Sequence, residues 1–139
     1  MKQFVLDASV TLSWFLDSPV PDLAIRVRRS LANGSRAVVP PLWRLEVANG
    51  FAVAERRGVL TASFADRCLD DIEGLTASVI DESAAAISLR QAHSVARSFR
   101  LTAYDAAYLE TARRDHLPLA TLDRALAEAA AKALIPLFR

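Results

Sequence analysis

Short runs of apolar residues alternate along the chain with longer segments in which apolar residues recur every three or four positions. The first pattern is typical of buried strands and the second of amphipathic helices. The apolar runs predict four strands and a short fifth strand at an edge, over residues 2–6, 36–39, 76–80, 117–121 and 135–138. The helical periodicity predicts seven helices, over residues 10–16, 21–32, 42–57, 61–73, 83–99, 103–115 and 123–132.

Capping and helix-breaking residues set the predicted helix boundaries. Pro21 suits the first position of a helix, where its missing N–H group costs nothing. Thr61 and Thr102 can each accept a hydrogen bond from the first turn of the helix that follows. Gly34 and Gly74 suit helix ends, because glycine readily adopts the left-handed conformation found there. We therefore expect the helix that starts at Thr61 to stop at Gly74.

The order of these elements predicts the fold class. Strands separated by helices favour a mostly parallel sheet, because each parallel connection needs a crossover long enough to hold a helix. Such crossovers are right-handed and place helices on the faces of the sheet. The sequence therefore predicts an α/β fold, a three-layer α/β/α sandwich with a central and mostly parallel sheet, in a single domain over residues 1–139. Ligands of such folds bind at the carboxyl ends of the strands.

The composition agrees with one ordered, cytoplasmic domain. Hydrophobic residues make up 53% of the 139 residues, which is ample for a core. No window approaches the roughly 18 uninterrupted apolar residues of a membrane span. Asp7 interrupts the first apolar run too early for a secretory signal, and the single cysteine, Cys68, allows no intrachain disulfide. A net charge of +1 argues against a broad nucleic-acid-binding surface but permits a local phosphate-binding groove.

Four acidic residues, far apart in the sequence, are expected to meet at the carboxyl edge of the sheet. Asp7 and Asp123 directly follow the first and fourth predicted strands. Asp105 lies in the first turn of the helix that leads back to the fourth strand, so its end of the helix lies at the same edge. Glu46 lies in the first turns of the helix that follows the second strand. The topology alone would bring all four together.

Each of three aspartates also has a purely structural interpretation. Asp7 and Asp123 stand where a helix N-cap would stand, and Asp105 could complete a capping box with Thr102. Taken singly, each is as well explained by capping as by chemistry. Their convergence at one edge is what favours a functional site.

Glu46 is harder to explain structurally. It shares a predicted helical stripe with Asn49, between Leu42 and Val53, which are expected to face the core. An inward carboxylate is costly unless it is paired or bound to metal, and no Lys or Arg stands at an obvious pairing position. A hard cation such as Mg²⁺ or Mn²⁺ is the natural partner of such oxygens. Metal-activated water would then serve hydrolysis of a phosphodiester without a protein nucleophile.

The segments that carry these acids resemble the motifs of the PIN-domain family, in particular the VapC-like toxin ribonucleases of type II toxin–antitoxin systems. The similar segments include Val-Leu-Asp-Ala-Ser-Val, Leu-Glu-Val-Ala-Asn, Leu-Thr-Ala-Tyr-Asp-Ala-Ala-Tyr-Leu and Leu-Pro-Leu-Ala-Thr-Leu-Asp, at residues 5–10, 45–49, 101–109 and 117–123. Each motif alone is weak, but the ordered set spans nearly the whole chain. The final segment, residues 133–139, is a poorer match.

The resemblance implies a metal-dependent endoribonuclease that forms a homodimer and is blocked by a cognate VapB-like antitoxin protein. The implied cofactor is Mg²⁺ or Mn²⁺, and the implied substrate is RNA. The catalytic and metal-binding roles would fall on Asp7, Glu46, Asp105 and Asp123. Supporting hydrogen bonds would come from Ser9, Asn49 and Thr121.

Other interpretations stay open at this point. A metal-dependent phosphatase of the haloacid dehalogenase kind also has an Asp after its first strand, but it usually has a second Asp where this chain has Ser9. A PIN fold used only for binding is a further alternative, and RNA cleavage with and without Mg²⁺ would separate the three. Arg44 and Arg124 stand near the acids in sequence, and we expect them to contact substrate phosphates, although a solvated or ion-paired arginine explains either position as well.

Overall fold

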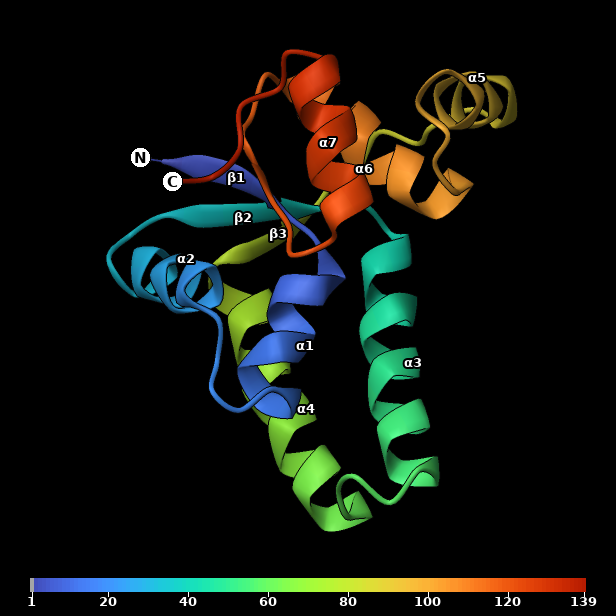
Figure 1. Cartoon of the computed structure of the whole chain (residues 1–139). Helices are drawn as coiled ribbons and strands as arrows, with labels where there is room; N and C mark the ends of the chain where they lie inside the picture. Colours follow the sequence, from blue (N-terminus) through green and yellow to red (C-terminus); the bar gives the residue numbers. More distant parts are fainter. Residues whose placement is uncertain (1) are drawn as a thin grey trace.

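The protein is built around a parallel four-stranded sheet, as the computed structural model of residues 2–139 shows (Figure 1). The strands follow the order β3-β2-β1-β4, and each neighbouring pair is parallel. They are β1 (Gln3–Leu6), β2 (Arg36–Val39), β3 (Ile80–Glu82) and β4 (Leu119–Ala120). The predicted α/β fold class is therefore confirmed.

The described residues form seven helices, six of which lie between strands and one of which follows the last strand. They are α1 (Ala8–Leu16), α2 (Asp22–Ala32), α3 (Leu42–Arg56), α4 (Ala62–Ser78), α5 (Leu89–Phe99), α6 (Ala103–Asp115) and α7 (Arg124–Lys132). Figure 1 shows α1 to α4 on one side of the sheet and α6 and α7 on the other, with α5 packed outside α6. Two helical layers thus enclose the sheet, and α3 and α4 extend beyond it.

The core lies between these layers and explains the strand sequences. Three of the four residues in β1 and in β2 are buried, as expected for strands covered on both faces. The largest fully buried side chains include Trp43 and Phe51 of α3, Tyr108 of α6 and Phe4 of β1. Strands and helices from the whole length of the chain therefore share one core.

The predicted helix end at Gly74 is wrong. Helix α4 continues to Ser78, and β3 occupies Ile80–Glu82 instead of residues 76–80. A glycine inside a helix costs about 1 kcal/mol relative to alanine. Here Leu75 and Val79 pack against the core and offset that cost. Residues 76–78 of the predicted strand are thus the last turn of α4, and only residue 80 belongs to a strand.

Helix α5 also starts later than residue 83. Residues 83–88 form a loop, and Ser88 caps α5 by accepting a hydrogen bond from the backbone N–H of Gln91 at 3.1 Å. The backbone N–H of Ser83 donates instead to Val39 O at 2.8 Å, which extends the pairing of β3 with β2 and excludes a helix there. Arg114 holds the loop through Ser83 Oγ at 2.9 Å.

The last predicted strand, over residues 135–138, is reduced to a single parallel bridge between Leu119 and Leu137. Pro136 lacks the N–H group needed for a longer ladder. The predicted start of α6 is confirmed, since Thr102 Oγ1 accepts a hydrogen bond from Asp105 N at 3.1 Å. None of the helices in residues 2–139 is both long and apolar enough to cross a membrane.

Candidate active site

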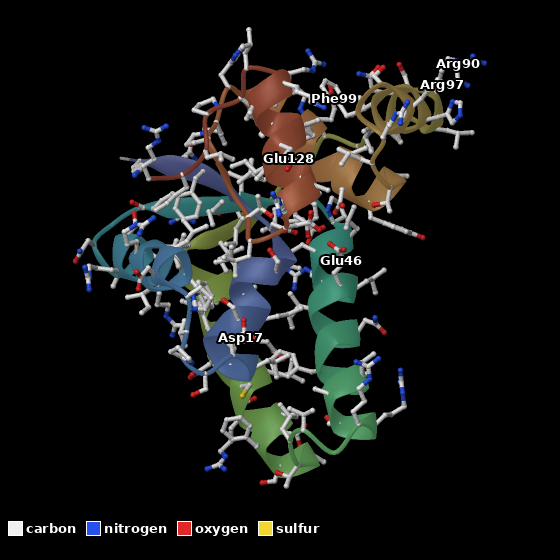
Figure 2. The ribbon with its side chains drawn as sticks, viewed as in Figure 1. Asp17, Glu46, Arg90, Arg97, Phe99 and Glu128 are labelled. Carbon is white, nitrogen blue, oxygen red and sulfur yellow. The ribbon has the colours of Figure 1, made fainter. Side chains whose placement is uncertain are left out.

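The four predicted acids are Asp7, Glu46, Asp105 and Asp123, and we refer to them as the acidic cluster. Asp7 directly follows β1, and its backbone N–H donates to Ala120 O of β4 at 3.0 Å, so the two strand ends are joined at this point. Asp123 follows β4 and precedes α7. Figure 2 shows Glu46 at the end of α3 that lies next to the sheet. The carboxyl edge of the sheet thus gathers these positions, as the topology predicts.

Asp7 is held by two hydroxyl groups. Its side chain is almost fully buried, and its Oδ2 accepts hydrogen bonds from Ser9 Oγ and Thr121 Oγ1, each at 2.6 Å. The two hydroxyl oxygens in turn accept from the backbone N–H groups of Leu122 and Asp123, both at 3.0 Å. This network fixes the orientation of the carboxylate but brings no positive charge to it.

The helix-cap interpretation of Asp7 does not hold. Asp7 occupies the N-cap position of α1, but its side chain makes no capping hydrogen bond to that helix. Asp123 does cap α7, because its Oδ1 accepts from Leu126 N at 3.0 Å. The structural role of Asp123 therefore uses one carboxylate oxygen, while the side chain of Asp7 contributes nothing to the capping of α1.

Glu46 has a partner that the sequence analysis missed. The hydroxyl of Tyr108 donates to Glu46 Oε1 at 2.5 Å, and the Tyr108 hydroxyl oxygen accepts from Ala8 N at 3.4 Å. Tyr108 is fully buried in α6, three residues after Asp105. A buried tyrosine needs a partner for its hydroxyl, and its place one helical turn beyond Asp105 was the signal that could have revealed it.

The acids affect one another electrostatically. Burial, followed by the charges of Asp123, Asp7 and Glu46, raises the pKa of Asp105 to about 6. Burial also raises the pKa of Asp7, and the charge of Asp123 adds to this effect, although the Ser9 and Thr121 hydroxyls oppose it. Burial and the charge of Asp7 raise the pKa of Glu46, against the opposing effect of its Tyr108 hydrogen bond. Among residues 2–139, no basic side chain is a cause of any of these three pKa changes.

Asn49 is not part of the buried face of α3. Its side chain is exposed, and Glu46 is only half-buried. The prediction that the stripe containing Glu46 and Asn49 faces the core is therefore wrong, because α3 is rotated about its axis by part of a turn. The helix instead buries a neighbouring stripe that contains Trp43, Val47, Phe51 and Ala54. Burial of two large aromatic rings releases more free energy than burial of Leu42 and Val53, and this sets the rotation of the helix.

The two arginines proposed for substrate contact are paired with acids outside the cluster. Arg44 Nε lies 2.7 Å from Glu82 Oε2, and Arg124 Nε lies 3.3 Å from Glu128 Oε1. The side chain of Arg124 is 94% exposed. Both ion pairs lie at the surface, where such pairs contribute little, so either arginine could exchange its partner for a phosphate.

The donor atoms of the acidic cluster fit a hard divalent cation. In the part of the chain that the structure describes, the four carboxylates form no ion pair with a basic side chain, and they offer the oxygen ligands that Mg²⁺ and Mn²⁺ prefer. Within residues 2–139, no three acidic, histidine or cysteine side chains already surround a common point closely enough to hold a metal ion. The carboxylates that fit the ion would therefore have to turn towards one another as it binds.

Comparison with known proteins agrees with this architecture. The chain belongs to the PIN domain family, whose sequence profile matches residues 4–132. Eight chains of known structure match it, including the crystal structure of PAE2754 from Pyrobaculum aerophilum. That protein is 22% identical over 92% of this chain and 84% of its own, with a TM-score of 0.69, which supports the shared fold. No curated protein matches. PIN domains are usually metal-dependent nucleases and often belong to toxin–antitoxin systems.

Proposed function

We propose that the protein is an endoribonuclease that depends on Mg²⁺ or Mn²⁺ and hydrolyses RNA phosphodiesters at the acidic cluster. The observation that carries this proposal is the position of the four acids at the carboxyl edge of the sheet, where none of them forms an ion pair with a basic side chain of the described residues. Burial and the charges of the other three acids accordingly raise the pKa of Asp105. A group of acids that disfavour one another's ionisation is costly to a fold unless a cation binds among them. Membership of the PIN domain family supports nuclease activity, and the acidic cluster is the site at which we propose that it occurs.

The side chains around the cluster would divide the work as follows. A bound divalent ion would activate water and stabilise charge on the phosphodiester. Asp7 would hold the ion from a fixed direction, because the hydroxyls of Ser9 and Thr121 lock its carboxylate. Glu46, Asp105 and Asp123 would complete the ligand set, with Glu46 and Asp105 on helices that lie on opposite sides of the sheet. No serine or cysteine nucleophile is required by this scheme.

We also propose that the protein is the toxin of a type II toxin–antitoxin system, acting as a homodimer and blocked by an antitoxin protein. Exposed apolar side chains support a surface that partners cover, among them Ile25 of α2 and Phe64 of α4. A largely apolar hollow of about 570 Å³ lies beside α1 and α2, with Trp14, Phe15 and Val20 among its lining residues. Apolar surface of this kind is typical of protein-binding sites.

The test is cleavage of total RNA by purified protein in Mg²⁺, in Mn²⁺ and in excess chelator. We expect cleavage only with metal, and at least a ~100-fold loss in Asp7→Asn. Asp17→Asn is the matched control, since Asp17 lies exposed at the opposite end of α1 (Figure 2). Full activity in chelator would refute the mechanism.

Two further outcomes would identify the alternatives. Release of phosphate from small esters without RNA cleavage would make the protein a phosphatase. Inertness towards both substrates would make it a binding module. The toxin role is tested separately: expression of the parent should arrest growth, expression of Asp7→Asn should not, and equal growth of the two strains would count against a nuclease toxin.

A further inference from the structure

Tyr108 joins three elements at one buried hydroxyl. Its ring is fully buried in the middle of α6. Its hydroxyl donates to Glu46 Oε1 of α3 at 2.5 Å and lies 3.4 Å from Ala8 N, the first residue of α1. These two partners lie 62 and 100 positions before Tyr108 in the sequence. Such a contact is not needed to fill space, because phenylalanine would fill the same volume.

The hydroxyl contact is directed at the acidic cluster. Within the described residues, Glu46 makes no ion pair with Lys, Arg or His, so the Tyr108 hydroxyl is the donor that holds its half-buried carboxylate. Because Oε1 accepts this bond, Oε2 is the oxygen left for a ligand. Ala8 directly follows Asp7, so the same phenol also borders the backbone that carries the second acid.

We propose that Tyr108 is a positioning residue of the metal site: it fixes Glu46 so that one carboxylate oxygen stays available to a divalent cation beside Asp7 and Asp105. This inference rests on the metal-dependent function proposed above. A residue outside the ligand set that orients a ligand by a hydrogen bond typically changes metal affinity by about 10–100-fold when it is lost. The role differs from that of a core residue, whose loss lowers stability and leaves metal affinity unchanged.

The test compares Tyr108→Phe with Tyr104→Phe. Tyr104 lies on the same helix one turn earlier and is 65% exposed, so its substitution removes an identical hydroxyl outside the site. Mn²⁺ affinity is measured by titration calorimetry without RNA. We expect Tyr108→Phe to bind Mn²⁺ about 10–100-fold more weakly than the parent and Tyr104→Phe to match the parent. Equal Mn²⁺ affinity in Tyr108→Phe and the parent would overturn the proposal.

A second pair of variants shows whether Tyr108 acts through Glu46. In a Glu46→Gln background, adding Tyr108→Phe is expected to weaken Mn²⁺ binding by less than about threefold, because the carboxylate to be oriented is already gone. The same 10–100-fold loss in both backgrounds would overturn the role assigned to Glu46. If Tyr108→Phe weakens Mn²⁺ binding as expected but the parent protein does not cleave RNA, the positioning role of Tyr108 would stand and the proposed nuclease activity would be refuted. A parent that binds no Mn²⁺ would overturn both.

Discussion

Replacing Asp105 by asparagine is expected to stabilise the metal-free protein at neutral pH but not at acidic pH. Burial and the charges of the other three acids raise the pKa of Asp105 from an ordinary 3.8 to about 6. At about 1.4 kcal/mol per pKa unit, this difference corresponds to about 3 kcal/mol. Because the side chain is partly exposed, solvent screening reduces the expected contribution to about 1–2 kcal/mol.

The direction of the pH dependence follows from proton binding. The folded state holds a proton on Asp105 more tightly than the unfolded state does, so folding is favoured below pH 4 and loses this contribution as the pH rises towards 6 and beyond. Asparagine does not titrate. The stability difference between Asp105→Asn and the parent should therefore be small at about pH 4 and reach about 1–2 kcal/mol at about pH 7.5.

Urea denaturation in chelator at several pH values measures this difference directly. The corresponding rise in melting temperature at neutral pH is about 3–6 °C. Asp22→Asn serves as the control, because Asp22 is an exposed acid in the first turn of α2 and shares any interaction with the helix dipole. A difference that is equal at both pH values, or a variant that is less stable than the parent at pH 7.5, would refute the reasoning.

Three other substitutions or measurements test the remaining interpretations. Asp7→Asn should melt higher than the parent in chelator but gain less from Mg²⁺, which stabilises a binding-competent fold by about 2.7 kcal/mol at a hundredfold excess over Kd; equal melting temperatures and equal metal shifts would contradict this. Arg44→Ala and Arg124→Ala should each weaken RNA binding without sequence bias and lower the salt slope by about one; unchanged affinity and slope would exclude both from the site. Sedimentation at about tens of micromolar should show a dimer that Ile25→Asp or Phe64→Asp weakens, and a strictly monomeric parent would count against self-association.

The gathering of the acids could be predicted because it depends on topology. Residues that follow parallel strands must lie at one edge, whatever the detailed packing, and this placed Asp7 and Asp123 from strand positions alone. A local preference placed the start of α6, because threonine is a favoured N-cap residue and Thr102 stands at that position. These features require only the order of elements and local hydrogen-bonding preferences.

Other features depend on three-dimensional competition that a linear pattern does not contain. The rotation of α3 was set by Trp43 and Phe51, which displaced Asn49 from the buried face. The length of α4 was set by tertiary packing of Leu75, which outweighed the helix-ending tendency of Gly74. The bond between Tyr108 and Glu46 joins residues 62 positions apart, so the spacing of Tyr108 from Asp105 could place its hydroxyl near the acidic cluster but could not identify Glu46 as its partner.

The hydroxyl pair around Asp7 makes the two oxygens of its carboxylate inequivalent. Ser9 and Thr121 each accept from a backbone N–H group and give their only proton to Oδ2. An incoming proton is therefore directed to Oδ1, where it competes with a cation for the same atom. An asparagine at this position can satisfy both hydroxyls only with its oxygen at Oδ2, which turns its NH₂ group towards the place of the cation. Asn at position 7 thus presents an N–H donor where the cation needs an oxygen ligand, and the neutral hydroxyls of Ser9 and Thr121 fix this orientation.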